Sequence, residues 1–315
     1  MRQTSFLLAV AMAVFAFPGA AAAAPAADAA KTYKVFIFAG QSNAQGKINK
    51  ATLDAQVQDP KTRDLYKHLR KDDQWLVRDD VFATYQNNRT GPLTLGFGSS
   101  GRTGSELEFG WMMGDRFEQP VVLIKAAWGG HSLVKLFRSP SAGMPSEEKL
   151  QAELTQAQDR VKKANEKNKK KAPLPTMGEI KEPYGSSYRA MMAEVKDTLT
   201  NYETMFPALK GKQLEVAGFV WFQGWNDMYG GAEKEYASNL AHFIRDVRKD
   251  LGVPKLPFVI AAMGQNGSKP AGGAMLEVRE AQMSLNGVPE FKGNVKAFRT
   301  DLLVKLLTEY AFDDF

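Results

Sequence analysis

Five short apolar segments along the chain have the length and residue types of buried strands. They cover residues 33–39, 120–126, 216–222, 258–262 and 295–298. Between them apolar side chains recur at helical spacing, most clearly at Tyr236, Leu240, Phe243, Ile244, Val247 and Leu251. We expect a second helix over residues 188–202. This alternation predicts a three-layer α/β/α sandwich around a mainly parallel five-stranded sheet.

Two helical segments carry unusual charge. Glu106 and Glu108 precede a helix-like segment over residues 109–117, where carboxylates favour the positive helix end, so we interpret them as capping residues rather than substrate contacts. Residues 146–172 are rich in Glu, Gln, Lys and Ala and end before two prolines, which predicts an inserted, exposed helix.

The formal net charge of +6 comes from that inserted segment. Residues 160–171 hold seven Lys or Arg against Glu166 alone, and charges balance elsewhere. We interpret the run as a solvated basic helix, with contact to a polyanion such as acidic glycan or lipopolysaccharide as the alternative. Nucleic acid is not an expected partner.

The N-terminus has the order of a secretory signal peptide. Met1-Arg2, an apolar run over residues 6–17 and a small-residue tract predict a signal peptide at 1–24, a linker at 25–30 and a single domain at 31–315. An exported protein, periplasmic or extracellular, follows. The apolar run is too short for a stable span, so we expect no membrane insertion. The absence of cysteine excludes disulfides, thiolate catalysis and cysteine metal sites.

Three predicted strands end in residues suited to acyl chemistry. The first runs into Gly40-Gln41-Ser42-Asn43, a turn that can expose a serine hydroxyl where α/β sheets bind ligands. The second precedes Gly129-Gly130, whose amides can face a carbonyl. The third precedes Gln223 and Asn226, whose side-chain amides can donate to an oxyanion. Each block alone also fits an ordinary turn or helix cap.

Together these blocks resemble those of the SGNH (GDSL-like) hydrolase superfamily. More narrowly, residues 38–43, 104–110, 128–130 and 221–224 look like the sialate O-acetylesterase and acetylxylan esterase group, over about residues 31–301. The resemblance implies a flavodoxin-like SGNH fold, Ser42 as nucleophile, and oxyanion donors at Gly129 or Gly130 and at Gln223. Where that group has Gln-Gly-Glu-x-Asp, this chain has residues 223–227 as Gln-Gly-Trp-Asn-Asp, so Asn226 shares or replaces the role of Gln223.

The resemblance also implies a C-terminal Asp-x-x-His block, which this sequence lacks. No histidine follows Asp313 and Asp314, and we expect truncation or a shifted reading frame. Of the three histidines, His68 and His242 fit structural or solvated positions. His131 adjoins the glycine pair, so it is the candidate base, with a glycan contact or a plain exposed loop position as the alternatives.

The resulting hypothesis is a serine esterase that removes O-acetyl groups from carbohydrate without metal or cofactor. Substrate contacts are expected from Gln41, Asn43, Trp225 and Asp227, with Trp128 and Tyr229 as further aromatic candidates. A general SGNH lipase or thioesterase and a non-catalytic carbohydrate-binding relative are the alternatives. The identity of the sugar and the oligomeric state stay open.

Overall fold

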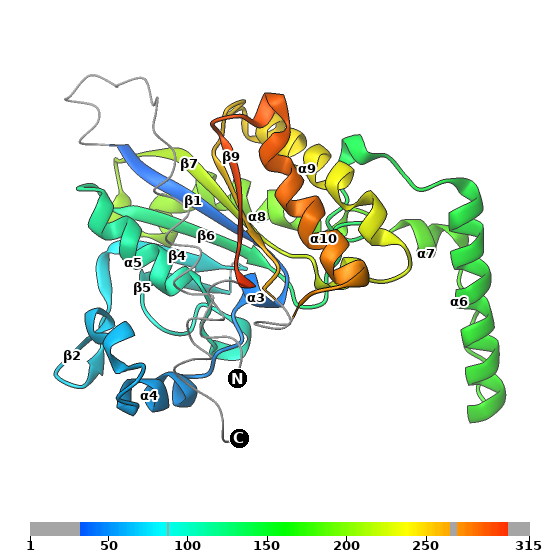
Figure 1. Cartoon of the computed structure of the whole chain (residues 1–315), viewed down its shortest axis with the longest axis horizontal. Coiled ribbons are helices and arrows are strands. Elements are labelled where there is room, and N and C mark those ends of the chain that lie inside the picture. Colours follow the sequence, from blue (N-terminus) through cyan, green and yellow to red (C-terminus); the bar gives the residue numbers. More distant parts are fainter. Residues whose placement is uncertain (1–31, 87, 265–269, 302–315) are drawn as a thin grey trace.

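A seven-stranded sheet forms the centre of the molecule, in the order β5-β4-β6-β1-β7-β8-β9 (Figure 1). The computed structural model describes residues 32–86, 88–264 and 270–301. The predicted signal peptide, the linker and the segment after Asp301 lie outside the described residues. The strands are β1 (Thr32–Gly40), β4 (Arg78–Tyr85), β5 (Arg89–Leu93), β6 (Val121–Ala127), β7 (Gln213–Phe222), β8 (Phe258–Ala262) and β9 (Val295–Arg299). Neighbours pair in parallel except β4 and β5.

The predicted fold class is confirmed, but the count of five strands was two short. Strand β4 begins with three charged residues, and β5 contains Gly91 and Pro92, which are typical of loops. Pairing with β6 gives β4 its strand conformation, and β5 is an edge strand, where proline is tolerated. A separate two-stranded hairpin joins β2 (Arg70–Lys71) to β3 (Gln74–Trp75).

Helices cover both faces of the sheet, as the near-continuous apolar strands require. Alternate residues of β1 divide between two cores: Val35 and Ile37 pack with one set of helices, and Phe36 and Phe38 with the other. The first set is α8 (Ser186–Met205), α9 (Tyr236–Leu251) and α10 (Gly273–Ser284), and the second is α3 (Ser42–Gln45), α4 (Lys50–Gln58) and α5 (Glu106–Arg116). Short 3-10 helices lie at Arg63–Leu65, Lys67–Leu69, Ser99–Gly101, Pro140–Ala142, Pro207–Leu209, Trp225–Asp227, Ala232–Glu235, Leu285–Gly287 and Pro289–Phe291.

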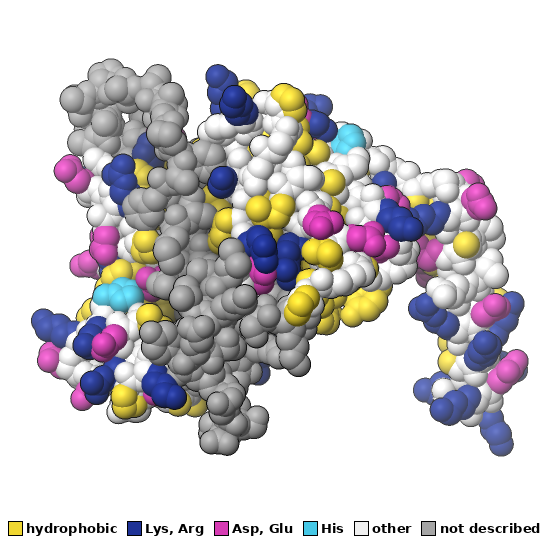
Figure 2. Space-filling view, viewed as in Figure 1, with side chains coloured by type: hydrophobic (Ala, Val, Ile, Leu, Met, Phe, Trp, Pro, Cys, Tyr) yellow, Lys and Arg dark blue, Asp and Glu magenta, His cyan; other side chains and the backbone are white. Residues whose placement is uncertain are grey.

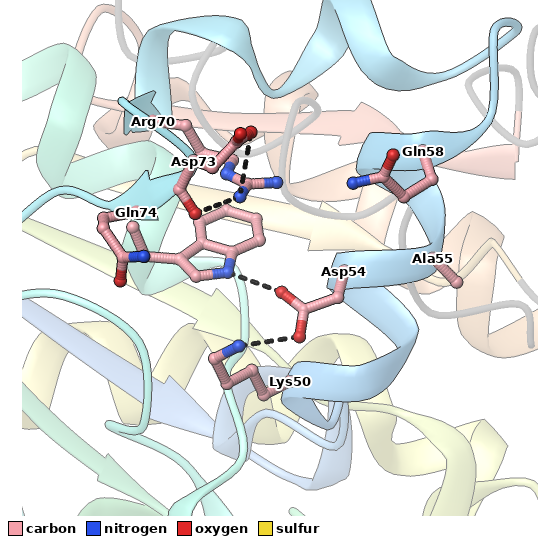
Figure 3. A pocket seen from close by; sticks show the side chains of 8 residues that line it. Lys50, Asp54, Ala55, Gln58, Arg70, Asp73 and Gln74 are labelled. Carbon is pink, nitrogen blue, oxygen red and sulfur yellow. Dashed lines mark hydrogen bonds and ion pairs between the residues drawn. The ribbon is translucent and has the colours of Figure 1, made fainter.

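Helix α4 and the β2–β3 hairpin form a small unit at one side of the molecule (Figure 1), and Figure 3 shows the side chains between them. Asp54 accepts a hydrogen bond from Trp75 Nε1 at 2.8 Å and another from Lys50 Nζ at 2.7 Å. Arg70 lies over the Trp75 ring, with its guanidinium carbon 5.3 Å from the ring centroid. The Trp75–Asp54 hydrogen bond therefore attaches the hairpin to the helix, and the cation–π contact between Arg70 and Trp75 stabilises the hairpin itself.

Helix α6 (Glu147–Asn168) occupies the segment where the sequence predicts an inserted helix, and it projects from the body of the molecule (Figures 1 and 2). Its first turns pack Leu150 and Leu154 against Ile180 and Tyr184, next to the short helix α7 (Met177–Lys181). It ends at Lys169 in the left-handed conformation. In the part of the chain that the structure describes, no helix is long and apolar enough to cross a membrane.

Candidate active site

Ser42 lies at the carboxyl end of β1, at the start of α3. The turn requires Gly40, which has φ +145° and whose added Cβ would lie 2.1 Å from the Phe222 carbonyl oxygen. Ser42 is partly exposed in a shallow depression lined by Asn43, Lys47 and Ser105 among others. Within the described residues no hydrogen bond to Ser42 Oγ is found. The predicted nucleophile is thus at the sheet edge where a ligand can reach it.

The neighbouring strands bring the other two blocks to the same edge. Gly40 pairs with Ala127 of β6 and with Phe222 of β7, so the segments that follow these strands lie on either side of Ser42. Backbone hydrogen bonds fix both segments: Trp128 N donates to Gly40 O, and Gln41 N donates to Phe222 O, each at 3.1 Å. The parallel register therefore assembles the three predicted blocks.

The side chain of Gln41 joins the serine turn to the loop after β7. Its Oε1 accepts hydrogen bonds from Gln223 Nε2 at 3.1 Å, Gly224 N at 3.1 Å and Asn226 N at 3.3 Å. Its Nε2 donates to Asn226 Oδ1 at 3.2 Å. Gln41 is only 4% exposed, so the side chain that we expected to contact substrate instead holds two loops together.

The two predicted amide donors of the β7 loop differ in their surroundings. Gln223 is 1% exposed, and its Nε2 lies within hydrogen-bonding distance of Gln41 Oε1, His131 O and Asp227 Oδ2. Asn226 is partly exposed, and within the described residues its side-chain nitrogen Nδ2 has no hydrogen-bond acceptor. Asn226 is therefore the better-placed donor for an oxyanion, while Gln223 is occupied inside the protein.

Gln45 joins α3 to the glycine loop in the same way. Gly129 N donates to Gln45 Oε1 at 3.1 Å, and Gln45 Nε2 donates to Tyr85 Oη at 2.8 Å. Gly130 is exposed with φ +82°, a conformation that favours glycine. The predicted donor Gly129 thus has an acceptor on the helix that begins with Ser42, and Gly130 lies one residue further along the exposed loop.

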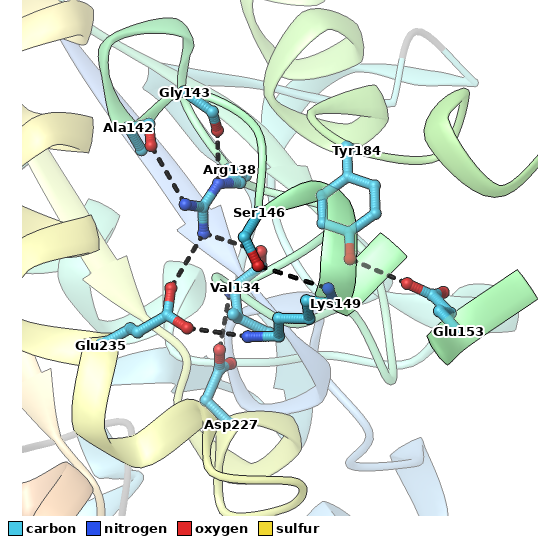
Figure 4. Close-up of polar contacts among 10 residues, drawn as sticks. All are labelled: Val134, Arg138, Ala142, Gly143, Ser146, Lys149, Glu153, Tyr184, Asp227 and Glu235. Carbon is cyan, nitrogen blue, oxygen red and sulfur yellow. Dashed lines mark hydrogen bonds and ion pairs between the residues drawn. The ribbon is translucent and has the colours of Figure 1, made fainter. Parts of the chain in front are cut away.

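Asp227 connects the β7 loop to the segment after the glycine pair (Figure 4). Its carboxylate is fully buried and accepts hydrogen bonds from Leu133 N at 2.8 Å, Val134 N at 2.7 Å and Gln223 Nε2 at 2.5 Å. Burial raises the pKa of this carboxyl to about 6, although the three donors oppose that shift. We expected a substrate contact here, and the structure uses the side chain to bind backbone instead.

In the described part of the chain, none of the three histidines is hydrogen-bonded to Ser42. His131 Nδ1 lies 2.7 Å from Ser187 Oγ, and the ring stacks on Trp128 with centroids 6.0 Å apart. Burial lowers the pKa of His131, so its ring is neutral near pH 7. His68 Nε2 lies 2.9 Å from Glu108 Oε2, which raises the pKa of His68, and His242 Nδ1 lies 2.8 Å from Ser141 Oγ.

A buried ion pair behind the glycine loop was missed from the sequence. Lys125 Nζ lies 2.5 Å from Glu106 Oε2, with both side chains 1% exposed, and it also donates to Phe97 O at 2.8 Å. Glu106 and Glu108 lie in the first turn of α5, at the positive helix end as predicted, but their carboxylates also pair with Lys125 and His68, which was not predicted. The signal was a lysine inside an otherwise apolar strand, which needs a buried partner.

Two aromatic side chains border the loop after β7. Trp225 is 40% exposed and Tyr229 60% exposed, whereas most large apolar side chains of the described chain are buried. They flank Asn226 along the sequence. Among the described residues no group of three or more His, Asp or Glu side chains has the arrangement of a metal site.

Comparison with protein families gives a match over residues 32–302, to the model described as carbohydrate esterase, sialic acid-specific acetylesterase. The chain belongs to this family. A probable carbohydrate esterase of Arabidopsis thaliana is 33% identical over 72 residues, which cover 22% of this chain and only 26% of that relative. The matched stretch thus spans about a quarter of the relative's length.

Solved structures similar to this carbohydrate esterase family member have low sequence identity. A protein from Arabidopsis thaliana has 16% identity and a TM-score of 0.48, covering 88% of this chain and 97% of the other. A carbohydrate acetylesterase from Xanthomonas citri has 14% identity and a TM-score of 0.45, and the match covers 84% of this chain and 49% of the other. NanS has 14% identity and a TM-score of 0.44, and the match covers 85% of this chain and 78% of the other.

Proposed function

We propose that this chain is a carbohydrate O-acetylesterase in which Ser42 forms an acetyl-enzyme. Ser42 Oγ attacks the acetyl carbonyl, the sugar hydroxyl leaves with a proton, and water then releases acetate and regenerates the serine. The observation that carries the proposal is the pair of side-chain links on either side of Ser42. Gln41 joins the serine turn to the β7 loop, and Gln45 joins it to the glycine loop.

These links support a preorganised oxyanion site. Gly130 and Asn226 lie on the two loops that flank Ser42. The donors proposed for the developing charge are the backbone N–H of Gly130 and the side-chain Nδ2–H of Asn226. Gln41 holds the Asn226 side chain by its Oδ1, which orients the amide before substrate arrives. Gly129 contributes by positioning the loop through Gln45.

Exposed aromatic and cationic side chains support a sugar substrate with acidic character. Trp225 and Tyr229 offer ring faces on which a pyranose can stack. Lys47 lines the depression beside Ser42, and its pKa is lowered by burial and by the nearby cation of Arg102. A cation at this depression, with Arg102 near it, favours an ester of a carboxylated sugar, such as a sialate, over neutral acetylxylan.

A second function, carbohydrate binding without turnover, is favoured by the position of His131. Its Nδ1 is engaged with Ser187, and no described group accepts the Ser42 proton. As the base candidate, His131 would act through Nε2. The resemblance implies a histidine base near the C-terminus, and the sequence has no histidine after His242.

The test is acetate release from an O-acetylated sialic acid and from acetylated xylan, with Ser42→Ala prepared identically. We expect the serine variant to lose at least about 10³-fold in rate. Equal, near-background rates from both folded proteins would reject the esterase hypothesis. Carbohydrate binding without turnover would then be the remaining hypothesis, and a sugar-binding titration checks it. A rate that rises with acyl chain length across nitrophenyl esters would indicate a lipase or thioesterase.

Export is proposed from the N-terminal sequence alone. Expression of the full chain in a bacterium, followed by fractionation and mass determination of the secreted form, tests it. Cleavage after residue 24 is the expected result, and an uncleaved cytoplasmic product would contradict it.

A further inference from the structure

The two halves of α6 differ in how their charges are satisfied. In the first half, Lys149 pairs with Glu235 at 2.7 Å, Glu147 pairs with Lys181 at 3.3 Å, and Glu153 pairs with Lys135. In the second half the ion pair between Lys162 and Asp159 is local and 3.6 Å long. Within the described chain, no ion pair reaches Lys163, Lys167 or the lysines at 169–171.

Three cations in this second half share one face of the helix. Arg160, Lys163 and Lys167 are spaced i, i+3 and i+7, and each is exposed. Together they form a line about 10 Å long, at 1.5 Å per residue. Like charges at this spacing destabilise an isolated helix, so helix stability gives no reason for the arrangement. Lys169, Lys170 and Lys171 continue the basic surface past the helix end.

We propose that this line, which we call the basic stripe, binds an acidic polysaccharide chain. A linear row of exposed cations complements a linear polyanion in both shape and charge. The partner is a glycan because the chain belongs to a carbohydrate esterase family. This inference extends the proposed function from one acetylated sugar to a polymer that the protein holds at a second surface.

The base of α6 is fixed to the candidate active site (Figure 4). Lys149 and Arg138 both bond Glu235, at 2.7 and 3.3 Å, and Arg138 also donates to Val134 O at 3.2 Å. Val134 N in turn donates to Asp227. A chain of hydrogen bonds therefore connects the helix to the loops beside Ser42, so that a polymer on the stripe has a set position relative to the serine.

The composition of the stripe favours a polymer over a membrane surface. Helices that lie in a lipid interface bury large apolar side chains such as Trp, Phe or Leu beside their cations. In α6 beyond Asp159 the apolar residues are only Val161 and Ala164. The exposed Leu174 stands alone on the returning chain.

The experiment is a binding titration of the full chain with polysialic acid, with neutral dextran as the ligand control, at low and moderate salt. The test variant combines Arg160→Gln, Lys163→Gln and Lys167→Gln, which preserves helix propensity. The control variant combines Lys210→Gln, Lys255→Gln and Lys292→Gln, three exposed lysines on other elements with the same charge change.

We expect the stripe variant to bind polysialic acid at least about tenfold more weakly and with a shallower salt dependence, since fewer counterions are released. The control variant should bind like the original chain, and Ser42→Ala should bind unchanged, which separates this inference from the proposed catalysis. Equal weakening in both charge variants, no binding at low salt, or tighter binding to anionic phospholipid vesicles would overturn the proposal.

Discussion

The candidate active site and the basic stripe treat polar side chains in opposite ways. Gln41, Gln223 and Asp227 are at most 4% exposed, and each is hydrogen-bonded to a loop from another strand. Arg160 and Lys163 are exposed, and the described contacts of Arg160 stay within its own helix. The buried groups fix geometry because leaving them unpaired is costly, whereas the exposed cations remain free for an outside partner.

The buried ion pair gives the largest expected effect. Glu106→Gln leaves the Lys125 ammonium buried opposite a neutral amide, and we expect it to lower the free energy of unfolding by about 3 kcal/mol or more. Chemical denaturation measures this. Adding Lys125→Met should recover most of the loss, and a double variant no more stable than the single one would show that burial of Lys125 is not the cause.

Asp227 should make stability depend on pH. Its pKa is raised in the folded chain to about 6, so between about pH 4 and pH 6 the folded state holds a proton that the unfolded state releases. The stability contributed by this group is therefore greatest at low pH and falls as the pH rises through that window, by about 3 kcal/mol. Denaturation curves should show the original chain losing stability relative to Asp227→Asn as the pH rises from about 4 to about 6. Parallel pH profiles of the two proteins would contradict the assignment.

Gln41→Met should separate positioning from substrate contact. The three N–H groups on Oε1 lose their acceptor, which we expect to cost about 1–2 kcal/mol of stability. The Ser42-dependent kcat should fall about tenfold to a hundredfold with little change in KM, because the site is misplaced rather than emptied. Asn43→Ala, which removes a predicted substrate contact in the depression at Ser42, is the comparison variant and should raise KM instead. A rise in KM alone would restore the substrate-contact interpretation.

The basic stripe should give the smallest effect on stability. The combined Arg160→Gln, Lys163→Gln and Lys167→Gln variant should change the free energy of unfolding by less than about 0.5 kcal/mol, because its side chains are exposed. Thermal denaturation checks this. A loss above about 1 kcal/mol would mean that the stripe is part of the fold, and the contrast with the buried site would fail.

Local periodicity determined most of the secondary structure from the sequence alone. Strand β8 matches the expected residues 258–262, and α9 matches the six apolar positions on one helix face. Strands β4 and β5 escaped prediction because charge, glycine and proline disfavour strands locally, and their pairing with distant residues decides their conformation. The α/β class and the three strand-end blocks thus followed from sequence pattern.

Only the tertiary structure decided what the site side chains do. The sequence placed Gln41, Gln223 and Asp227 at strand ends, where contact with substrate was the natural expectation. Their partners lie far away along the chain, as with Gln41 and Asn226, which are 185 residues apart, and Asp227 and Leu133, 94 residues apart. A hydrogen bond depends on distance and angle between particular atoms, so periodicity brings such residues to one edge without showing which of them face inward.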